Sequence, residues 1–324
     1  MTIRSIKKAE LHCHVDGLLN PNILKDLQPK DKYQTLIAQL DKLCPVKDFK
    51  DWSENYGPQV YQLVSNKGEL LLEILGQYLR NLKQQNVIYS EIMLSSFTFQ
   101  YEDIGRQVEL YKKFKKSADE IGGDEMQVEF LIAIGRTTNR NKMEKRLERI
   151  LEIKKTGLIC GIAIAGLEEE NTIKPYADIF HQLKKAGLGI EIHAGEWKEP
   201  EFIWEALEYG YADRIGHGLS TFDDPVLVKH IKDKAIHIEF CPTSNLLLTK
   251  YKNIIDHPIK HAIQEGIRFS INTDDPGPFC CDIEHEYSVV QKAFNLTEVD
   301  FSKILKHSLD AAFTGNKTVM AKYS

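Results

Sequence analysis

Two histidines, His12 and His14, lie two residues apart at the end of an apolar run near the N-terminus. Side chains alternate along a strand, so in a strand over 9–15 both imidazoles point to one face. Two imidazole nitrogens on one face can bind a metal ion, although a histidine pair at a strand edge has the same spacing. The chemistry of this pair therefore depends on the residues that join it.

Other polar residues cluster where predicted strands end. They fall in the segments Glu191-Ile-His-Ala-Gly-Glu196, Arg214-Ile-Gly-His-Gly218 and Ser270-Ile-Asn-Thr-Asp-Asp275. A single buried histidine is more often a hydrogen-bonded core residue than a ligand. Three imidazoles and a carboxylate that converge on one point, however, suit a catalytic zinc ion with room for a water. We expect one zinc per chain, because the fourth predicted strand ends in Ala165-Gly166 with no Lys or Glu to bridge a second ion.

The elements that must position these residues are short Ile- and Val-rich runs separated by longer amphipathic segments, a pattern typical of parallel strands covered by helices. We predict eight strands, over 9–15, 87–94, 128–134, 159–165, 188–193, 214–217, 236–240 and 267–272. Predicted helices cover 68–85, 107–121, 141–155, 173–186, 199–210, 224–234 and 256–265. Eight strand and helix repeats with right-handed crossovers close most simply as a (β/α)8 TIM barrel of the α/β class, in which active sites lie at the carboxyl ends of the strands.

Residues 17–86 are longer than one crossover helix requires, and they follow the histidine pair directly. We interpret them as a helical lid over the active face, inserted in a single domain that spans 1–324. Phe49 and Trp52 would form its apolar face and contact the substrate, although helix-core roles fit their spacing equally well. After the last strand, 296–301 and 307–313 are predicted as C-terminal helices, the first with a capping box from Thr297 to Asp300.

Composition narrows the partner and the compartment. The 324 residues carry a net charge of −5, with Lys and Arg interleaved among Asp and Glu, which argues against nucleic acid and favours a small-molecule partner. The sequence has no apolar run long enough to span a membrane and no signal-like N-terminus, so we expect a cytoplasmic protein. Six cysteines without Cys-x-x-Cys spacing favour reduced thiols. Nothing indicates an obligate protein partner.

Five segments together resemble the adenosine deaminase family of metal-dependent hydrolases, in the same order, from about residue 8 to about residue 314. They are His12-x-His-x-Asp-Gly17, His193-Ala-Gly-Glu196, Arg214-Ile-Gly-His-Gly218, Cys241-Pro-Thr-Ser-Asn245 and Ser270-x-Asn-Thr-Asp-Asp-Pro276. The resemblance implies that the zinc ligands are His12, His14, His193 and Asp274. The His-x-Glu and Pro-Cys-x-x-Cys pattern of cytidine-type deaminases is absent from the sequence.

The same resemblance implies a mechanism in which water attacks C6 of a purine. Zinc can lower the pKa of water to about 7, and Glu196 would donate a proton to N1 of the ring. A carboxylic acid that donates at neutral pH needs a pKa raised by a dry site. His217 would either orient or deprotonate the attacking water.

Substrate contacts are implied as well. Asp275 would meet N7 of the base in its protonated form, and the backbone N–H of Gly166 would reach N3. Asp16 would meet a ribose hydroxyl, and His14 would border the substrate in addition to binding zinc. Asp274 and Asp275 cannot both face the barrel centre in a regular strand, so we expect the chain to turn before Pro276.

The sequence departs from the family pattern near the substrate. Family members commonly have Arg at the position of Met93 and an acidic residue at the position of Ala163. In the fourth-strand motif of this chain, Leu167 precedes the glutamate. We expect hydrolytic deamination of adenosine or 2′-deoxyadenosine to inosine or 2′-deoxyinosine and ammonia. The alternatives are a deaminase of another aminated purine, such as adenine or a modified adenosine or nucleotide, and a non-catalytic nucleoside-binding relative.

Overall fold

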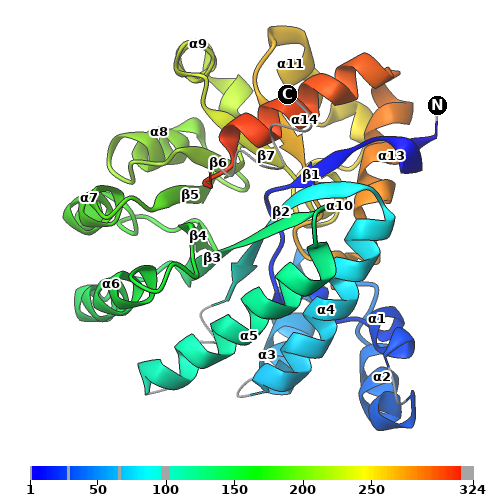
Figure 1. Cartoon of the computed structure of the whole chain (residues 1–324). Helices are drawn as coiled ribbons and strands as arrows, with labels where there is room; N and C mark the ends of the chain where they lie inside the picture. The colour runs from blue at the N-terminus through cyan, green and yellow to red at the C-terminus, as the bar shows by residue number, and fades with distance from the viewer. Residues whose placement is uncertain (1, 28–29, 65–66, 96–102, 315–324) are drawn as a thin grey trace.

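The computed structural model describes residues 2–27, 30–64, 67–95 and 103–314. Its strands form one parallel eight-stranded sheet in the order β1 to β8, surrounded by helices (Figure 1). The sheet closes because the chain after β1 bridges the chain after β8, with the His14 N–H donating to the Asp274 carbonyl at 2.9 Å. The predicted TIM barrel is confirmed.

The strand bounds agree with the predicted runs except for the first and the last strand, which are shorter than predicted. The strands are β1 Lys8–Glu10, β2 Val87–Leu94, β3 Gln127–Gly135, β4 Gly161–Ala165, β5 Gly189–Ala194, β6 Arg214–His217, β7 His237–Phe240 and β8 Phe269–Ile271. The prediction of a strand over 9–15 was wrong in its length. The regular ladder stops at Glu10, and beyond it Cys13 and His14 make only isolated bridges to Asp274 and Met93.

The barrel helices follow the predicted segments closely. The α-helices are α1 Pro21–Asp26, α2 Gln34–Leu40, α3 Gly57–Val64, α4 Gly68–Gln84, α5 Ile104–Gly122, α6 Arg140–Lys154, α7 Ala177–Lys185, α8 Pro200–Glu208, α9 Pro225–Lys234, α10 Pro242–Leu248, α11 Ile259–Glu265, α12 Pro276–Phe279, α13 Ile283–Phe294 and α14 Glu298–Ala311. The two predicted C-terminal helices are one continuous helix, because the buried positions Phe301, Ile304 and Leu309 keep a helical spacing throughout α14. Its predicted Thr297 and Asp300 capping box is present.

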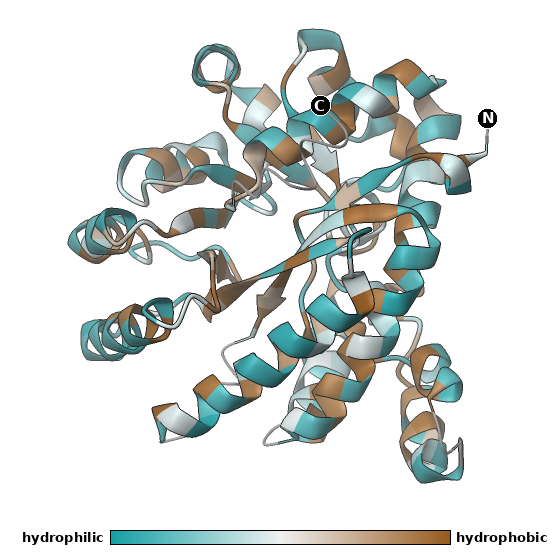
Figure 2. Cartoon of the chain, viewed as in Figure 1, coloured by the Kyte–Doolittle hydropathy of each residue, from teal (hydrophilic) through white to brown (hydrophobic). Residues whose placement is uncertain are grey.

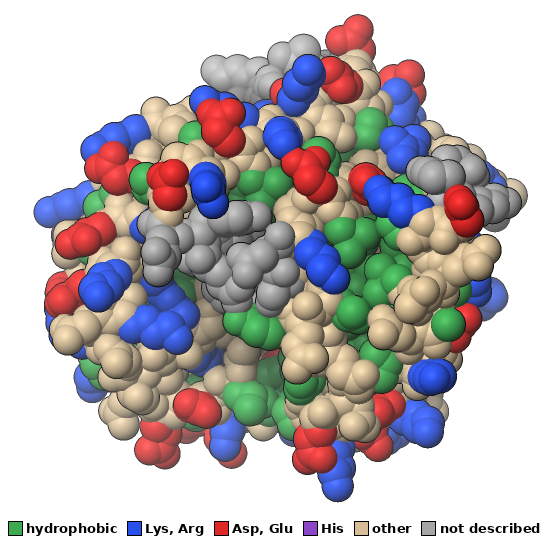
Figure 3. Space-filling view, turned by 90° about the horizontal axis from the view of Figure 1, so that it is seen from below, with side chains coloured by type: hydrophobic (Ala, Val, Ile, Leu, Met, Phe, Trp, Pro, Cys, Tyr) green, Lys and Arg blue, Asp and Glu red, His purple; other side chains and the backbone are tan. Residues whose placement is uncertain are grey.

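The core lies between the sheet and its helices. All eight residues of β2 are buried, as expected for a parallel strand covered on both faces. The helices are amphipathic, with hydrophobic stripes turned toward the sheet and polar residues outward (Figure 2). In α4, for example, Leu71, Ile74 and Leu75 are buried. On the face in Figure 3, basic and acidic side chains are interspersed around gathered hydrophobic ones.

The segment between β1 and β2 is helical and packs on the loops around β8. The Tyr56 hydroxyl donates to the Leu19 carbonyl at 2.9 Å, and the Val46 N–H donates to the Pro278 carbonyl at 3.0 Å. The first bond is internal to the segment, and the second ties the segment to α12. Its function as a lid stays a prediction.

The opposite end of the barrel is closed by a buried ionic cluster. The Arg214 guanidinium pairs with Glu91 at 2.6 Å and with Glu239 at 2.5 Å. The Phe313 ring lies over it, 3.6 Å from the guanidinium carbon to the ring centroid.

Among the described residues, no helix is both long enough and apolar enough to cross a membrane. The six cysteines are unpaired.

Candidate active site

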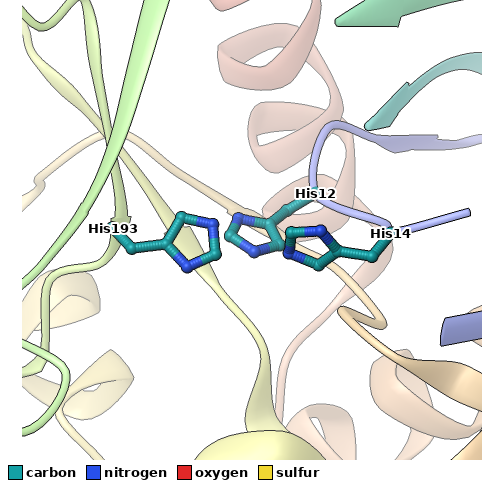
Figure 4. Close-up of side chains that lie close together, drawn as sticks. All are labelled: His12, His14 and His193. Atoms are coloured by element: carbon teal, nitrogen blue, oxygen red, sulfur yellow. The ribbon is translucent and has the colours of Figure 1, made fainter. Parts of the chain in front are cut away.

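Three imidazoles from two strand ends point toward one another (Figure 4). The ring centroids of His12 and His193 are 4.5 Å apart, and the His14 centroid lies 5.4 Å from that of His12 and 5.3 Å from that of His193. One nitrogen from each ring lies within 4.8 Å of the others. Although β1 is shorter than predicted, the extended chain beyond it brings the predicted histidines together.

Asp274 lies beside the same cluster. Its Oδ1 atom is 3.4 Å from Nε2 of both His12 and His14, and its Oδ2 atom accepts a 2.7 Å hydrogen bond from the Ser244 hydroxyl. Asp274 adopts a left-handed conformation with φ of 63°, so the chain turns before Pro276 as expected. This turn lets Asp274 and Asp275 face the same cavity.

The donor set fits a single divalent cation such as zinc. The Nε2 atoms of His12 and His193 are buried and have no hydrogen-bond partner among the described residues, which is costly unless an ion or water satisfies them. On the far side of the His12 ring, Nδ1 lies 2.9 Å from the Glu239 carboxylate. Such a carboxylate behind a ligand fixes the ring orientation and tautomer and directs Nε2 to the metal.

Glu196 occupies the loop after β5 and is buried beside this cluster. Burial raises the pKa of the Glu196 carboxyl well above its ordinary value, and the neighbouring Asp274 and Glu168 add to the effect. Its Oε2 atom has no hydrogen-bond partner among the described residues. The raised pKa favours the protonated form of Glu196, which can donate a hydrogen bond to a ligand in the cavity.

A second carboxylate holds the loop that carries Glu196. Glu168, after β4, accepts hydrogen bonds from the backbone N–H groups of Gly195 at 2.5 Å, Trp197 at 2.7 Å and Lys198 at 3.0 Å. These three donors flank Glu196 on both sides. Glu168 thus fixes the backbone from which the Glu196 side chain projects.

His217 ends β6 and faces the same cluster. Its Nε2 atom lies 3.3 Å from Nδ1 of His193 and 3.5 Å from Oε2 of Glu196. Burial lowers the pKa of His217 to about 3, so the ring is neutral at physiological pH. On its other side, Nδ1 contacts the Asn245 amide.

Two further carboxyl groups line the cavity. Burial raises the pKa of Asp275 well above its ordinary value, and Asp274 and Asp16 reinforce the shift. Burial also raises the pKa of Asp16 to about 6, and its Oδ1 atom has no partner among the described residues. Gly17 packs so closely against Asp275 that any β-carbon there would overlap the Asp275 carboxyl and Cα. The absence of a side chain at Gly17 therefore lets Asp275 reach the cavity.

The cavity has a volume of about 230 Å³. It is bordered by apolar side chains, among them Trp52, Trp197 and Leu248, and by small residues on β3 and β4. Gly166 lines it with φ of 89°, a conformation that glycine adopts easily. This combination of flat apolar walls and polar groups that converge on one side suits an aromatic heterocycle with polar ring atoms.

Most of the predicted site residues meet in this one cavity. Those that line it are His14, Asp16, Trp52, Gly166, His193, Glu196, His217, Asp274 and Asp275. His12 lies among them in the histidine cluster. Phe49 is not among the lining residues; it packs behind them, with its ring centroid 6.2 Å from Trp52 and 5.5 Å from Trp197.

Four supporting residues were missed: Glu168, Glu239, Ser244 and Asn245. Glu168, Ser244 and Asn245 lie in segments that the sequence singles out, so the signal was their place at strand ends. Their partners, however, come from other strands and could not be identified from spacing.

Two of the three departures from the family pattern lie in the same part of the structure. Met93 and Ala163 are fully buried in one apolar cluster with Leu131, Ala133 and Cys160. Replacement of both charged family residues by apolar ones therefore leaves no unpaired charge at either position. Leu167 is 47% exposed and does not line the cavity.

Comparison with known proteins gives one family match over nearly the whole chain. A family model described as adenosine deaminase matches residues 7–321. An adenine deaminase from Sinorhizobium fredii is 29% identical over 315 residues, covering 97% of this chain and 96% of that protein. An aminodeoxyfutalosine deaminase from Streptomyces avermitilis is 28% identical and covers 96% of this chain and 87% of that protein.

Solved structures share the fold. The crystal structure of an adenine deaminase from Arthrobacter aurescens superposes with a TM-score of 0.84 at 20% identity, covering 98% of this chain and 97% of that one. An Arabidopsis ADAL structure complexed with IMP gives a TM-score of 0.79 at 19% identity, with 98% and 95% coverage.

Proposed function

The chain belongs to the adenosine deaminase family, and from this membership we propose that it is a metal-dependent hydrolase that removes the 6-amino group of a purine. The proposal depends on one observation, namely that a set of metal-binding side chains and a buried carboxyl group lie in the same cavity. A nitrogen and carboxylate donor set suited to a divalent cation lies beside a buried, protonated carboxyl, Glu196. A binding protein gains nothing from such a poised acid.

In this proposal His12, His14, His193 and Asp274 hold one zinc ion. When bound, zinc supplies Lewis acidity that lowers the pKa of water to about 7. The protein groups then act on the purine. Glu196 donates its proton to N1, so that negative charge does not build up on the ring as C6 is attacked.

The remaining contacts orient the base. Protonated Asp275 donates a hydrogen bond to N7, and the Gly166 backbone N–H donates to N3. The Trp52 and Trp197 side chains border the cavity and exclude water. His217 contacts the attacking oxygen, either to orient it or to take its proton.

The relatives change our order of substrates. Their names specify adenine and aminodeoxyfutalosine, which supports adenine or a modified adenosine ahead of adenosine itself. The unpartnered Oδ1 atom of Asp16 supports a substrate with a hydroxyl group beyond the base. We therefore propose a 6-aminopurine substrate, with a modified adenosine and free adenine as the leading candidates and adenosine as the third.

The small size of this cavity also supports a small-molecule partner, and the unpaired cysteines support a cytoplasmic location. We include the small-molecule partner and the cytoplasmic location in the proposal.

A substrate panel tests the function and separates the candidates. Ammonia release is measured for the zinc-supplemented protein with adenine, aminodeoxyfutalosine, adenosine, 2′-deoxyadenosine and AMP, with zinc content determined in parallel. The variant Asp16→Asn is the matched comparison. It should lower kcat/KM for nucleosides and leave adenine nearly unaffected if Asp16 binds a sugar hydroxyl. Equal effects on adenine and nucleosides would contradict that role.

A further inference from the structure

A chain of buried hydrogen bonds leads from the start of α11 to the His217 ring. The Ile259 N–H donates to Nδ1 of His257 at 3.1 Å. Nε2 of His257 lies 3.1 Å from Oδ1 of Asn245, and Nδ2 of Asn245 lies 3.1 Å from Nδ1 of His217. The three side chains are buried, so these contacts are shielded from water.

Two main-chain N–H groups fix the direction of every bond in this chain, because a backbone N–H can only donate. The Ile259 N–H requires Nδ1 of His257 to be unprotonated, which places the proton of the neutral ring on Nε2. The Cys241 N–H points at Oδ1 of Asn245, 3.3 Å away, and identifies that atom as the oxygen. The amide NH₂ of Asn245 must then face His217.

His217 consequently receives a hydrogen bond at Nδ1. A neutral imidazole carries one proton, so the proton of His217 lies on Nε2. That is the atom directed at the catalytic cluster, 3.5 Å from Oε2 of Glu196 and 3.3 Å from Nδ1 of His193.

We propose that Asn245 and His257 are positioning residues that hold His217 in its Nε2–H tautomer. His217 then donates a hydrogen bond to the oxygen that attacks C6 and is not the base that removes its proton. This inference rests on the proposed function for the identity of that oxygen. It decides between the two functions of His217 that the family resemblance leaves open.

The tautomer is measurable without substrate. Nitrogen-15 NMR of histidine-labelled protein, without added metal and with zinc, distinguishes protonated from unprotonated ring nitrogens. We expect an unprotonated Nδ1 and a protonated Nε2 for His217 at neutral pH. Asn245→Asp replaces the donor by an acceptor, so Nδ1 should become protonated. A protonated Nδ1 with an unprotonated Nε2 in the parent protein would overturn the inference.

Kinetic variants test the same chain through activity, with the best substrate of the panel. Loss of a partner behind an active-site histidine typically costs 10- to 100-fold, so we expect kcat of Asn245→Asp and His257→Leu to fall by that order with KM little changed. His257→Gln should recover most of the activity, because the glutamine amide can still donate to Asn245. Thr249→Val is the matched control, since the Thr249 hydroxyl donates to the backbone carbonyl of Asn245 and accepts from the Tyr251 N–H, and neither bond involves the Asn245 side chain.

The outcomes are separable. Parent-like kcat and pH profile in both Asn245→Asp and His257→Leu would overturn the positioning role. The two sites keep the test informative if one variant fails to fold. If no panel substrate is turned over, the proposed function fails, while the NMR result still decides the tautomer.

Discussion

Replacing Glu168 with Gln should disturb catalysis indirectly, through the backbone on both sides of Glu196. The Glu168 carboxylate is 4% exposed and accepts three backbone N–H bonds, one at Oε1 and two at Oε2. A glutamine has only one acceptor oxygen. The amide NH₂ should replace Oε1, where it faces only the Gly195 N–H, because this orientation loses one hydrogen bond and the opposite one would lose two.

The cost follows from these contacts. A hydrogen bond to a charged group contributes about 1.5–3 kcal/mol, and the Gly195 bond is lost. The two remaining bonds become neutral, and each weakens by roughly half. We therefore expect Glu168→Gln to lower the free energy of unfolding by about 3–6 kcal/mol. A shift of about 1 Å in Glu196 would reduce kcat by as much as 100-fold.

The pH profile gives a separate readout. The negative charge of Glu168 contributes to the raised pKa of Glu196. Glu196 must be protonated to donate, so activity is lost as pH rises through its pKa. Removal of the Glu168 charge lowers that pKa, and the alkaline limb of the kcat profile should move to lower pH.

Denaturant unfolding and kcat profiles of Glu168→Gln, Glu196→Gln and the double variant test this reasoning. Glu169→Gln is the control, because Glu169 is the exposed neighbour. If Glu168 acts through Glu196, its effect on kcat should largely disappear in the Glu196→Gln background. Fully additive effects, or a parent-like pH profile in Glu168→Gln, would refute the account.

Three further substitutions have defined outcomes. Gly17→Ala places a β-carbon on Asp275 and should lower kcat by roughly 100-fold with zinc content unchanged, as measured by kinetics and metal analysis; a parent-like kcat would contradict the close packing. Burial raises the pKa of Glu286 from 4.5 to about 7, so ionisation in the folded state costs about 3 kcal/mol above pH 7 and nothing below pH 4.5. Urea unfolding should therefore show Glu286→Gln gaining stability over the parent at pH 8 and losing that gain near pH 5, whereas a pH-independent difference would exclude this cause. Ala163→Asp and Met93→Arg should each destabilise by several kcal/mol, because each buries an unpaired charge. The double variant should recover roughly 1–3 kcal/mol relative to the sum in a double-mutant cycle, and an additive result would show that the two positions are not coupled.

The sequence was sufficient to predict the architecture and which residues meet in the candidate site. Apolar runs of strand length and the residues at their ends predict both the barrel and the edge at which polar groups meet. Asp274 and Asp275 illustrate this, since the argument that adjacent side chains cannot share a face predicts the turn that the structure has.

Features that depend on contacts between distant segments were not predictable. The regular part of β1 ends at Glu10, and beyond it Cys13 and His14 make only isolated bridges. Alternation along the chain does not reveal this change. Similarly, Met93 and Ala163 appear in the sequence as two separate losses of charge. Only the fold shows that they lie in one apolar cluster.

The same limit applies to the residues that support the site. Glu168 and Asn245 stand in segments that the sequence singles out, but their partners belong to other strands. The substrate is a comparable case, since Asp16 alone favoured a nucleoside, whereas the relatives indicate a wider set of purines.

Product analysis in ¹⁸O-labelled water tests the central claim most directly. Zinc-loaded protein is incubated with adenine, aminodeoxyfutalosine, adenosine, 2′-deoxyadenosine and AMP, and the purine products and ammonia are quantified by mass spectrometry and an ammonia assay. We predict that at least one substrate yields a 6-oxopurine with one solvent oxygen and an equal amount of ammonia, and that Glu196→Gln loses this activity while retaining zinc. Absence of ammonia from all five compounds with zinc bound, or a product without solvent oxygen, would contradict hydrolytic deamination.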